Sequence, residues 1–286
     1  MPQVNLTKRV NIGGIELHLV EAGPSSGKPV LLLHGFPEYW WGWRNQIPAL
    51  ADAGFHVVAI DMRGYGQSDA PSDVGSYTLT TLTADIVSLA EKLGWHKFSV
   101  VGHDWGGIIA WALSARPPHL VETLAVLNAP HLDVLSNVLR EKPSQILRSS
   151  YVGFFQMPWI PETALSAAGY ALLRHALTST ARPGTFSQPE LERYTTEWAR
   201  PGRLKAMIHY YRALVQRPRE PLGPVSVPTL ILWGRQDLAL DEDLARASLM
   251  QCEDGRIDFH DAATHWIHLE EPQWVNQKLL AIMCAD

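Results

Sequence analysis

Short apolar runs alternate along this chain with segments whose apolar positions recur at helical spacing. The runs at 30–33, 55–60, 97–101, 121–127 and 227–233 predict strands, the first two buried on both faces of a parallel sheet. The segments 43–53 and 79–93 predict the helices that cross between them. A hairpin at residues 10–20 is expected to form an antiparallel sheet edge. The pattern therefore predicts an α/β fold with an open, mostly parallel, doubly wound sheet.

The pattern changes between about residues 131 and 222. No β-rich apolar run occurs there, and prolines recur between pieces with helical spacing. The strand and helix pattern resumes at 227, with a helix near 242–250, a strand near 256–259 and a closing helix at 272–283. We therefore expect one core domain, formed by residues 1–132 and 222–286, with a helical cap inserted at residues 133–221.

One corner of this pattern carries a chemical signal. The stretch from Lys97 to Ala110 predicts a strand, a sharp turn and a helix, and Gly102 and Gly106 flank Asp104 two positions on either side. This is the spacing of a nucleophile elbow, whose turn is so tight that glycine is needed beside the tip. The residue at the tip is an aspartate, where esterases and lipases have serine.

Other polar residues are expected at the same edge of the sheet. The segment 34–37 follows one buried strand, Asp237 follows another, and His265 lies in the loop before the last helix. The carboxyl ends of parallel strands form the binding crevice of an open α/β sheet. The order nucleophile, acid, histidine is that of the α/β-hydrolases.

Composition and charge narrow the function classes. The chain has 286 residues and a net charge of −5, with charges scattered along it, so nothing indicates binding to nucleic acid or to an anionic membrane. The N-terminal residues lack the pattern of a signal peptide, and no window is apolar enough to span a membrane, so we expect a cytoplasmic enzyme. Two cysteines exclude a disulfide framework. No phosphate loop and no metal-ligand spacing occurs, so we expect no cofactor and no metal.

Three motifs resemble those of the soluble epoxide hydrolases of the α/β-hydrolase fold. They are the phrases at 34–46 (HGFPEYWWGWRNQ), 61–68 (DMRGYGQS) and 102–107 (GHDWGG), and the resemblance extends over nearly the whole chain. It implies hydrolysis of an epoxide to a vicinal diol through an ester on Asp104. Water activated by His265 would cleave that ester, and Asp237 would orient the histidine.

The resemblance also implies roles for four other residues. The backbone N–H groups of Phe36 and Trp105 would form the oxyanion hole, where one donor typically lowers the barrier by about 3 kcal/mol. Two tyrosines of the cap, Tyr151 and Tyr211, would donate to the alkoxide that forms when the epoxide opens. The chain departs from the family at Thr264, where glycine usually precedes the histidine.

The aspartate nucleophile agrees with this chemistry. A serine that opened an epoxide would leave an ether, whereas a carboxylate leaves an ester whose carbonyl is open to water. The main alternative is a haloalkane or haloacid dehalogenase, which uses the same nucleophile; a non-catalytic receptor on this fold and a carboxylesterase fit less well. Eleven tryptophans, several near the motifs, favour a small hydrophobic epoxide as substrate. The protein is expected to be a monomer or a homodimer.

Several residues compete for the roles that the resemblance assigns. His260 and His268 are rivals of His265. Asp241 and Asp243 are rivals of Asp237, but their place favours capping of the next helix. For the tyrosines the rivals are Tyr170, Tyr194 and Tyr210, whose alternative role is packing between cap helices.

Overall fold

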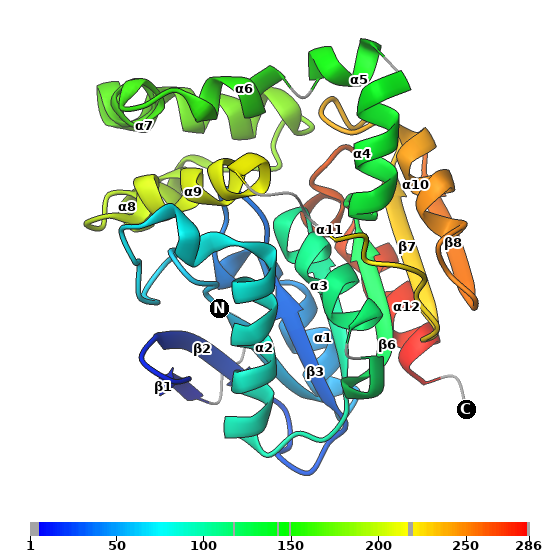
Figure 1. Cartoon of the computed structure of the whole chain (residues 1–286). Helices are drawn as coiled ribbons and strands as arrows, with labels where there is room; N and C mark the ends of the chain where they lie inside the picture. Colours follow the sequence, from blue (N-terminus) through cyan, green and yellow to red (C-terminus); the bar gives the residue numbers. More distant parts are fainter. Residues whose placement is uncertain (1–5, 117, 142, 149, 217–219, 285–286) are drawn as a thin grey trace.

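An eight-stranded sheet organises the protein (Figure 1), in the order β1-β2-β4-β3-β5-β6-β7-β8. The computed structural model describes residues 6–116, 118–141, 143–148, 150–216 and 220–284. The strands are β1 (Leu6–Asn11), β2 (Glu16–Ala22), β3 (Pro29–Leu33), β4 (His56–Ile60), β5 (Phe98–His103), β6 (Val121–Leu127), β7 (Thr229–Gly234) and β8 (Gly255–His260). Strand β2 pairs antiparallel with β1 and β4, and the pairs from β4 to β8 are parallel. This confirms the predicted mostly parallel sheet and its antiparallel edge.

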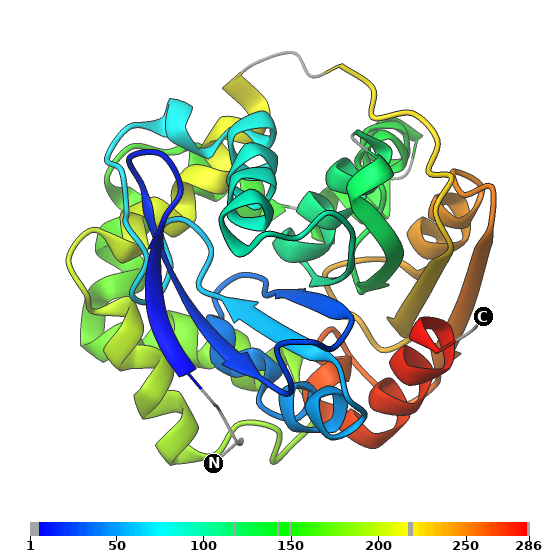
Figure 2. The ribbon, with the colours of Figure 1, turned by 90° about the horizontal axis from the view of Figure 1, so that it is seen from below.

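Helices cover both faces of the sheet, as Figure 2 shows from below. One face carries α2 (Leu79–Leu93), α3 (Trp105–Ala115) and α10 (Glu242–Leu249), and the other carries α1 (Gln46–Asp52) and α12 (Pro272–Met283). Each face has its own apolar cluster, because successive side chains of a strand point to opposite sides. Strands β3 and β5 are therefore almost entirely buried, which explains their continuous apolar sequence.

The segment between β6 and β7 is helical, as its sequence predicts. It contains α4 (Leu132–Glu141), α5 (Pro143–Arg148), α6 (Ser150–Gln156), α7 (Ile160–Thr180), α8 (Gln188–Trp198) and α9 (Arg203–Gln216). In Figure 1, α6 to α9 lie above the carboxyl ends of the parallel strands. No helix in the described part of the chain is long and apolar enough to cross a bilayer.

Two local elements differ from the sequence prediction. The helix expected from residue 43 begins at Gln46, because residues Trp40–Trp43 form a separate 3-10 turn, η1. The loop before the closing helix contains the short α11 (Ile267–Glu270), which has too few residues for a recognisable helical period. Two further 3-10 turns, η2 (Val74–Tyr77) and η3 (Pro118–Leu120), precede α2 and β6.

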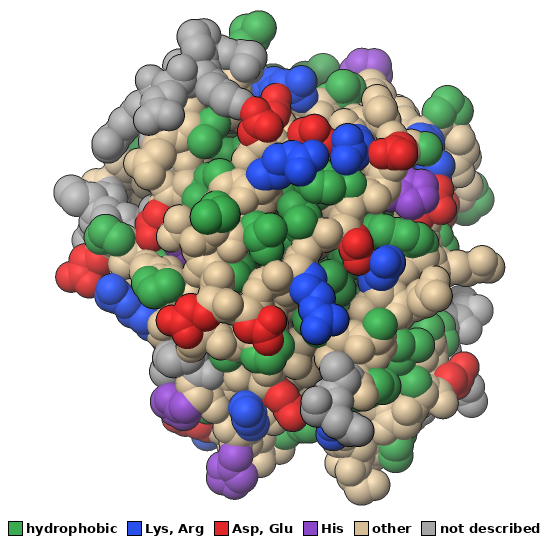
Figure 3. Space-filling view, turned by 90° about the vertical axis from the view of Figure 1, so that its right-hand side faces the viewer, with side chains coloured by type: hydrophobic (Ala, Val, Ile, Leu, Met, Phe, Trp, Pro, Cys, Tyr) green, Lys and Arg blue, Asp and Glu red, His purple; other side chains and the backbone are tan. Residues whose placement is uncertain are grey.

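Charged side chains of both signs mix on the face formed by α10 and β8 (Figure 3). Arg235 contacts Glu242 at 3.4 Å and Asp261 at 3.0 Å, and Arg246 contacts Glu242 at 3.6 Å. The scattered charges of the sequence are therefore interspersed on this surface as well, so it offers no field of a single sign.

The turn between β5 and α3 leaves no space for side chains at its glycines. A Cβ atom added to Gly102 would lie 2.4 Å from the carbonyl oxygen of Gly106, and one added to Gly106 would lie 2.1 Å from the carbonyl oxygen of Leu33. Helix α3 therefore packs directly against the backbone of β5 and β3. The glycine spacing of the sequence reflects this close approach.

We predict that Gly106→Ala lowers the free energy of unfolding by about 3 kcal/mol or more, since the added methyl group overlaps backbone atoms. Gly153→Ala on α6 is the matched control, because a Cβ atom there meets nothing within 4 Å and alanine favours a helix. Denaturant unfolding of the two variants measures the difference. Equal stability of the two would contradict this account of the elbow.

Candidate active site

The predicted site residues lie at the carboxyl ends of neighbouring strands. Asp104 follows β5, Asp237 follows β7 and His265 follows β8, while Phe36 comes after β3. Since β3, β5, β6, β7 and β8 are consecutive and parallel in the sheet, these ends meet at one edge. The structure thus brings together the three residues of the predicted triad from positions far apart in the sequence.

Asp104 occupies the tip of the elbow in a strained backbone conformation, with φ 50° and ψ −119°. Its Oδ1 atom accepts a hydrogen bond of 2.8 Å from the backbone N–H of Phe36. Its Oδ2 atom lies 3.8 Å from Nε2 of His265. The Asp104 carboxylate is therefore held between a backbone donor and an imidazole.

Trp105 begins α3, so its backbone N–H is one of those at the helix start that have no acceptor within the helix.

His265 is fixed by Asp237 on the side of the ring away from Asp104. The distance from His265 Nδ1 to Asp237 Oδ2 is 2.7 Å. The other oxygen of Asp237 accepts the backbone N–H groups of Ala239 at 2.8 Å and Leu240 at 3.0 Å. Because Asp237 is buried and accepts these bonds, its ring partner has one defined orientation, with Nε2 directed to Asp104.

The two carboxylates set the charge of the histidine. Burial alone would lower the pKa of His265, but the charge and hydrogen bond of Asp237, followed by the charge of Asp104, raise it to about 9. Burial would likewise raise the pKa of Asp237, yet the contacts with His265 and Asn128 lower it. At neutral pH the site therefore holds an imidazolium between two carboxylates.

Tyr151 and Tyr211 reach the site from the inserted helices. Their ring centroids are 5.8 Å apart, and Tyr211 lies 5.4 Å from Phe36 and 5.2 Å from Trp105. Burial, with the nearby charge of Asp104, raises the pKa of both phenols above its ordinary value. Both therefore remain protonated at neutral pH and can donate a hydrogen bond to an oxygen near Asp104.

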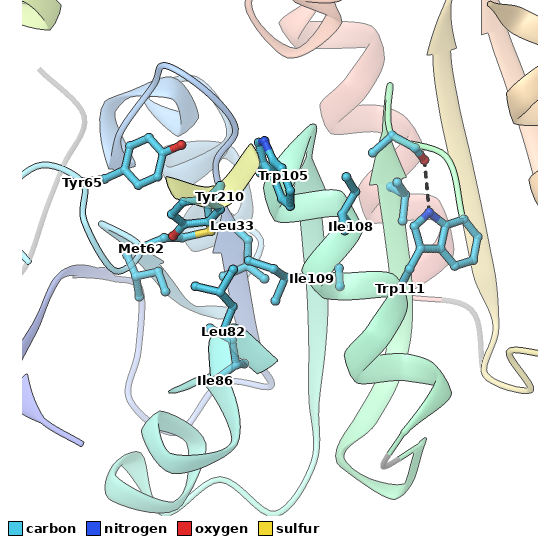
Figure 4. Packing of buried hydrophobic residues seen from close by; sticks show 14 of the residues in the cluster. Leu33, Met62, Tyr65, Leu82, Ile86, Trp105, Ile108, Ile109, Trp111 and Tyr210 are labelled. Carbon is cyan, nitrogen blue, oxygen red and sulfur yellow. Dashed lines mark hydrogen bonds between the residues drawn. The ribbon is translucent and has the colours of Figure 1, made fainter. Parts of the chain in front are cut away.

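The competing tyrosines point to other partners. Tyr170 donates to the carbonyl oxygen of Trp198 at 3.3 Å, and Tyr194 donates to Glu38 at 3.2 Å. Tyr210 donates to the carbonyl oxygen of Arg63 at 2.7 Å and packs beside Trp105 (Figure 4). Their hydroxyl groups bind inserted helices to each other or to the core.

The competing acids and histidines also have partners elsewhere. Asp241 caps α10, since its side chain accepts the N–H of Asp243 at 3.0 Å. His260 Nε2 lies 3.6 Å from a carboxylate oxygen of Glu271. His268 is fully buried, and its Nε2 lies 3.2 Å from Oε2 of Glu38.

A buried polar cluster, which the sequence does not reveal as a group, lies against the triad histidine. Glu38, His103 and His268 could offer ligand atoms to a metal ion, since these atoms all lie within 4.8 Å of one another. They also bond to each other, as the 3.0 Å distance from His103 Nδ1 to Glu38 Oε2 shows. Nε2 of His103 donates to the carbonyl oxygen of His265 at 2.9 Å. The cluster thus supports the loop that carries the triad histidine.

Asn128 also lies at the site and was not predicted from the sequence. Its Nδ2 atom donates to Oδ2 of Asp237 at 2.7 Å. The available signal was its position directly after the apolar run at 121–127, at the same carboxyl edge as the other site residues. A lone asparagine without a motif did not stand out.

Comparison with known proteins agrees with this geometry. The family model described as alpha/beta hydrolase fold matches residues 28–272. The AB hydrolase superfamily protein YfhM of Bacillus subtilis is 42% identical over 95% of this chain and 95% of its own length. Epoxide hydrolase 3 of Mus musculus is 39% identical over 97% of this chain and 78% of its own length. The solved structure of an epoxide hydrolase from Bacillus megaterium, in complex with an inhibitor, superposes with a TM-score of 0.90 at 28% identity, covering 97% of this chain and 100% of that one.

The chain therefore belongs to the α/β-hydrolase fold family. Within that fold it is a member of the epoxide hydrolase family, as its similarity to epoxide hydrolases at 39% and 37% identity and to the solved epoxide hydrolase structure shows. These findings confirm the fold class and the family that the three motifs predict.

We predict that the His265 ring titrates with a pKa of about 9. NMR of the labelled imidazole as a function of pH measures this pKa. Asp104→Asn is expected to lower this pKa, because it removes one neighbouring negative charge, and Asp237→Asn to lower it further, because Asp237 is the stronger influence. A ring that titrates near 6.5 in the unmodified protein, or that responds to neither variant, would contradict the charge arrangement described above.

Proposed function

We propose that this protein hydrolyses a small hydrophobic epoxide to a vicinal diol through a covalent ester on Asp104. The observation that carries the proposal is the environment of this one carboxylate: it occupies an elbow tip, accepts the N–H of Phe36 at 2.8 Å and lies 3.8 Å from His265. Proton donors for the substrate oxygen are supplied by Tyr151 and Tyr211.

In the first step, a carboxylate oxygen of Asp104 attacks one carbon of the epoxide ring. The bond between that carbon and the ring oxygen breaks, and the ring oxygen takes up the negative charge. Tyr151 and Tyr211 donate hydrogen bonds to this oxygen, and one of them transfers its proton. Without such donors the alkoxide would be a poor leaving group, so the two phenols lower the barrier of ring opening.

In the second step, water attacks the carbonyl carbon of the Asp104 ester, and His265 takes up a proton from that water. The developing oxyanion is stabilised by the N–H groups of Phe36 and Trp105, of which one donor is typically worth about 3 kcal/mol. When the intermediate collapses, the bond between the carbonyl carbon and the diol oxygen breaks, and that oxygen takes the proton held by His265. The second proton of the water returns to the tyrosinate left by the first step, so that the diol is released and the carboxylate and the phenol are restored. Because the ester carries no charge, the pKa of His265 falls when Asp104 is esterified, which frees the imidazole to act as a base.

The proposal also assigns a part to each region of the chain. We take residues 133–221 as the cap that carries both tyrosines, and residues 1–132 with 222–286 as the core that carries the triad. The reaction requires no cofactor and no metal. The partner is a small molecule, not a nucleic acid or a membrane, and we expect a cytoplasmic monomer or homodimer.

The dehalogenase alternative fits the site less well. A second halide donor is commonly expected where Phe36 stands, and a phenylalanine ring has no N–H to offer. That ring instead packs against Tyr211 at 5.4 Å and Phe155 at 5.6 Å. The tyrosine pair and the family of the relatives both favour the epoxide.

Turnover of a panel of small epoxides and haloalkanes tests the function, and the His265→Gln variant tests the intermediate. We predict that this variant opens an epoxide but does not hydrolyse the ester, so its intact mass increases by the mass of one substrate molecule. Asp104→Ala is the matched control and should show neither the adduct nor turnover. An adduct-free His265→Gln protein, or diol formation by Asp104→Ala, would contradict the covalent mechanism.

The two tyrosines are predicted to act in the first step only. Tyr151→Phe and Tyr211→Phe should each slow epoxide opening by about tenfold or more, and the double variant should nearly stop it, because the alkoxide loses its donors. Tyr170→Phe is the control, since its hydroxyl group bonds to Trp198 instead. Stopped-flow measurement of ester formation distinguishes the variants; an unchanged rate in the double variant would place the proton donor elsewhere.

A further inference from the structure

Asn128 stands at the carboxyl end of β6 in a conformation that few side chains adopt. Its φ angle is 43°, in the left-handed region, and the residue is fully buried. Its backbone N–H donates to the carbonyl oxygen of Leu232 at 3.1 Å. The next residue, Ala129, accepts the indole N–H of Trp111 at 3.1 Å, the bond drawn dashed in Figure 4. The surrounding structure therefore holds this corner in place, and a strained buried residue beside a site is a reason to seek its function.

The side chain of Asn128 has one orientation only. Its Oδ1 atom accepts the backbone N–H of Gly234 at 3.1 Å, and its Nδ2 atom donates to Oδ2 of Asp237 at 2.7 Å. Rotating the amide by half a turn would set an oxygen against the carboxylate and an NH₂ group against an N–H donor. The backbone of β7 thus directs the amide donor at Asp237.

Oδ2 of Asp237 is also the atom that lies 2.7 Å from His265 Nδ1. With the two backbone donors on Oδ1, the carboxylate accepts four hydrogen bonds, of which Asn128 and His265 supply the two on Oδ2. Among the residues that the structure describes, the charged groups in contact with Asp237 are His265 and, at the backbone carbonyl oxygen of Asp237, Arg148 at 2.9 Å. The amide of Asn128 is an uncharged donor. It stabilises the Asp237 anion, but it does not form an ion pair with Asp237 in place of His265, as a cationic side chain would.

We propose that Asn128 is a positioning residue for ester hydrolysis, which fixes Asp237 as an anion so that Asp237 can orient His265. The inference rests on the proposed function, because it assigns Asn128 to the second step and not to the first. The residue touches neither substrate nor Asp104 and acts through Asp237 alone. Its loss should therefore slow hydrolysis and leave formation of the ester unaffected.

Two variants test this role. Asn128→Asp keeps the size and the left-handed backbone but sets an oxygen against Asp237, so the pair must share a proton. Asn128→Gly keeps the backbone conformation and removes the amide. Asn276→Asp on α12 is the matched control, since its Nδ2 donates to a carbonyl oxygen, that of Asn45, at 3.0 Å. The rates of ester formation and of ester hydrolysis are measured separately, from the intact mass of the protein during a single turnover. The resonance of the His265 Nδ1 proton is measured by NMR.

In both Asn128 variants we expect ester hydrolysis to slow by about tenfold to a hundredfold, since a hydrogen bond to a charged group is lost. Ester formation should change by no more than about twofold. The His265 Nδ1 resonance should move, and Asn276→Asp should change neither rate. Hydrolysis at the original rate in Asn128→Asp with an unmoved resonance would overturn the inference, as would equal slowing of both steps. If the unmodified protein forms no ester, the proposed function fails, and the His265 resonance alone then decides whether Asn128 positions the triad.

Discussion

The backbone of Asp104 is the constraint on which the rest of the site depends. A side chain can be presented at the carboxyl edge of this sheet only if the chain turns sharply from β5 into α3, and that turn requires a left-handed residue between two close backbone contacts. The strain is borne by the surrounding sheet and by helix α3, whose first turn packs on the backbone of β3. Once the turn is made, the nucleophile, the N–H of Phe36 and the start of α3 have fixed relative positions.

The two aspartates of the site have the same chemical type, but their hydrogen-bond donors differ and suit them to different roles. Asp237 is enclosed by four donors and remains an anion that holds His265. Asp104 accepts the backbone N–H of Phe36 on Oδ1, and its Oδ2 lies 3.8 Å from the imidazole of His265, so it retains an oxygen that can attack carbon. In the proposed mechanism, the charge of Asp104 disappears when it becomes an ester, and the pKa of His265 then falls. The covalent step would thereby prepare the base for the hydrolytic step.

Local patterns in the sequence were sufficient for the sheet, the elbow and the family. The glycine spacing around Asp104 predicts a turn because the reason for it is steric and lies within five residues. The cluster of Glu38, His103 and His268 could not be predicted in this way, because its members are 65 and 165 positions apart and meet only through the order of the strands. Asn128 was missed for a similar reason: its partner Asp237 follows a different strand and lies 109 positions later in the sequence. The predicted helix bounds were wrong at a short 3-10 turn and at a four-residue helix, because neither is long enough to show the helical period of apolar residues.

The central claim is that the carboxylate of Asp104 is consumed and regenerated in each turnover. The most direct measurement is a single turnover of an epoxide in heavy-oxygen water, with excess enzyme, followed by mass analysis of the peptide that contains Asp104. Because water attacks the ester carbonyl, the account predicts that the heavy oxygen enters the Asp104 carboxylate and that the diol keeps light oxygen. Heavy oxygen in the diol with none in Asp104 would mean that water attacks the epoxide directly, and would contradict the account.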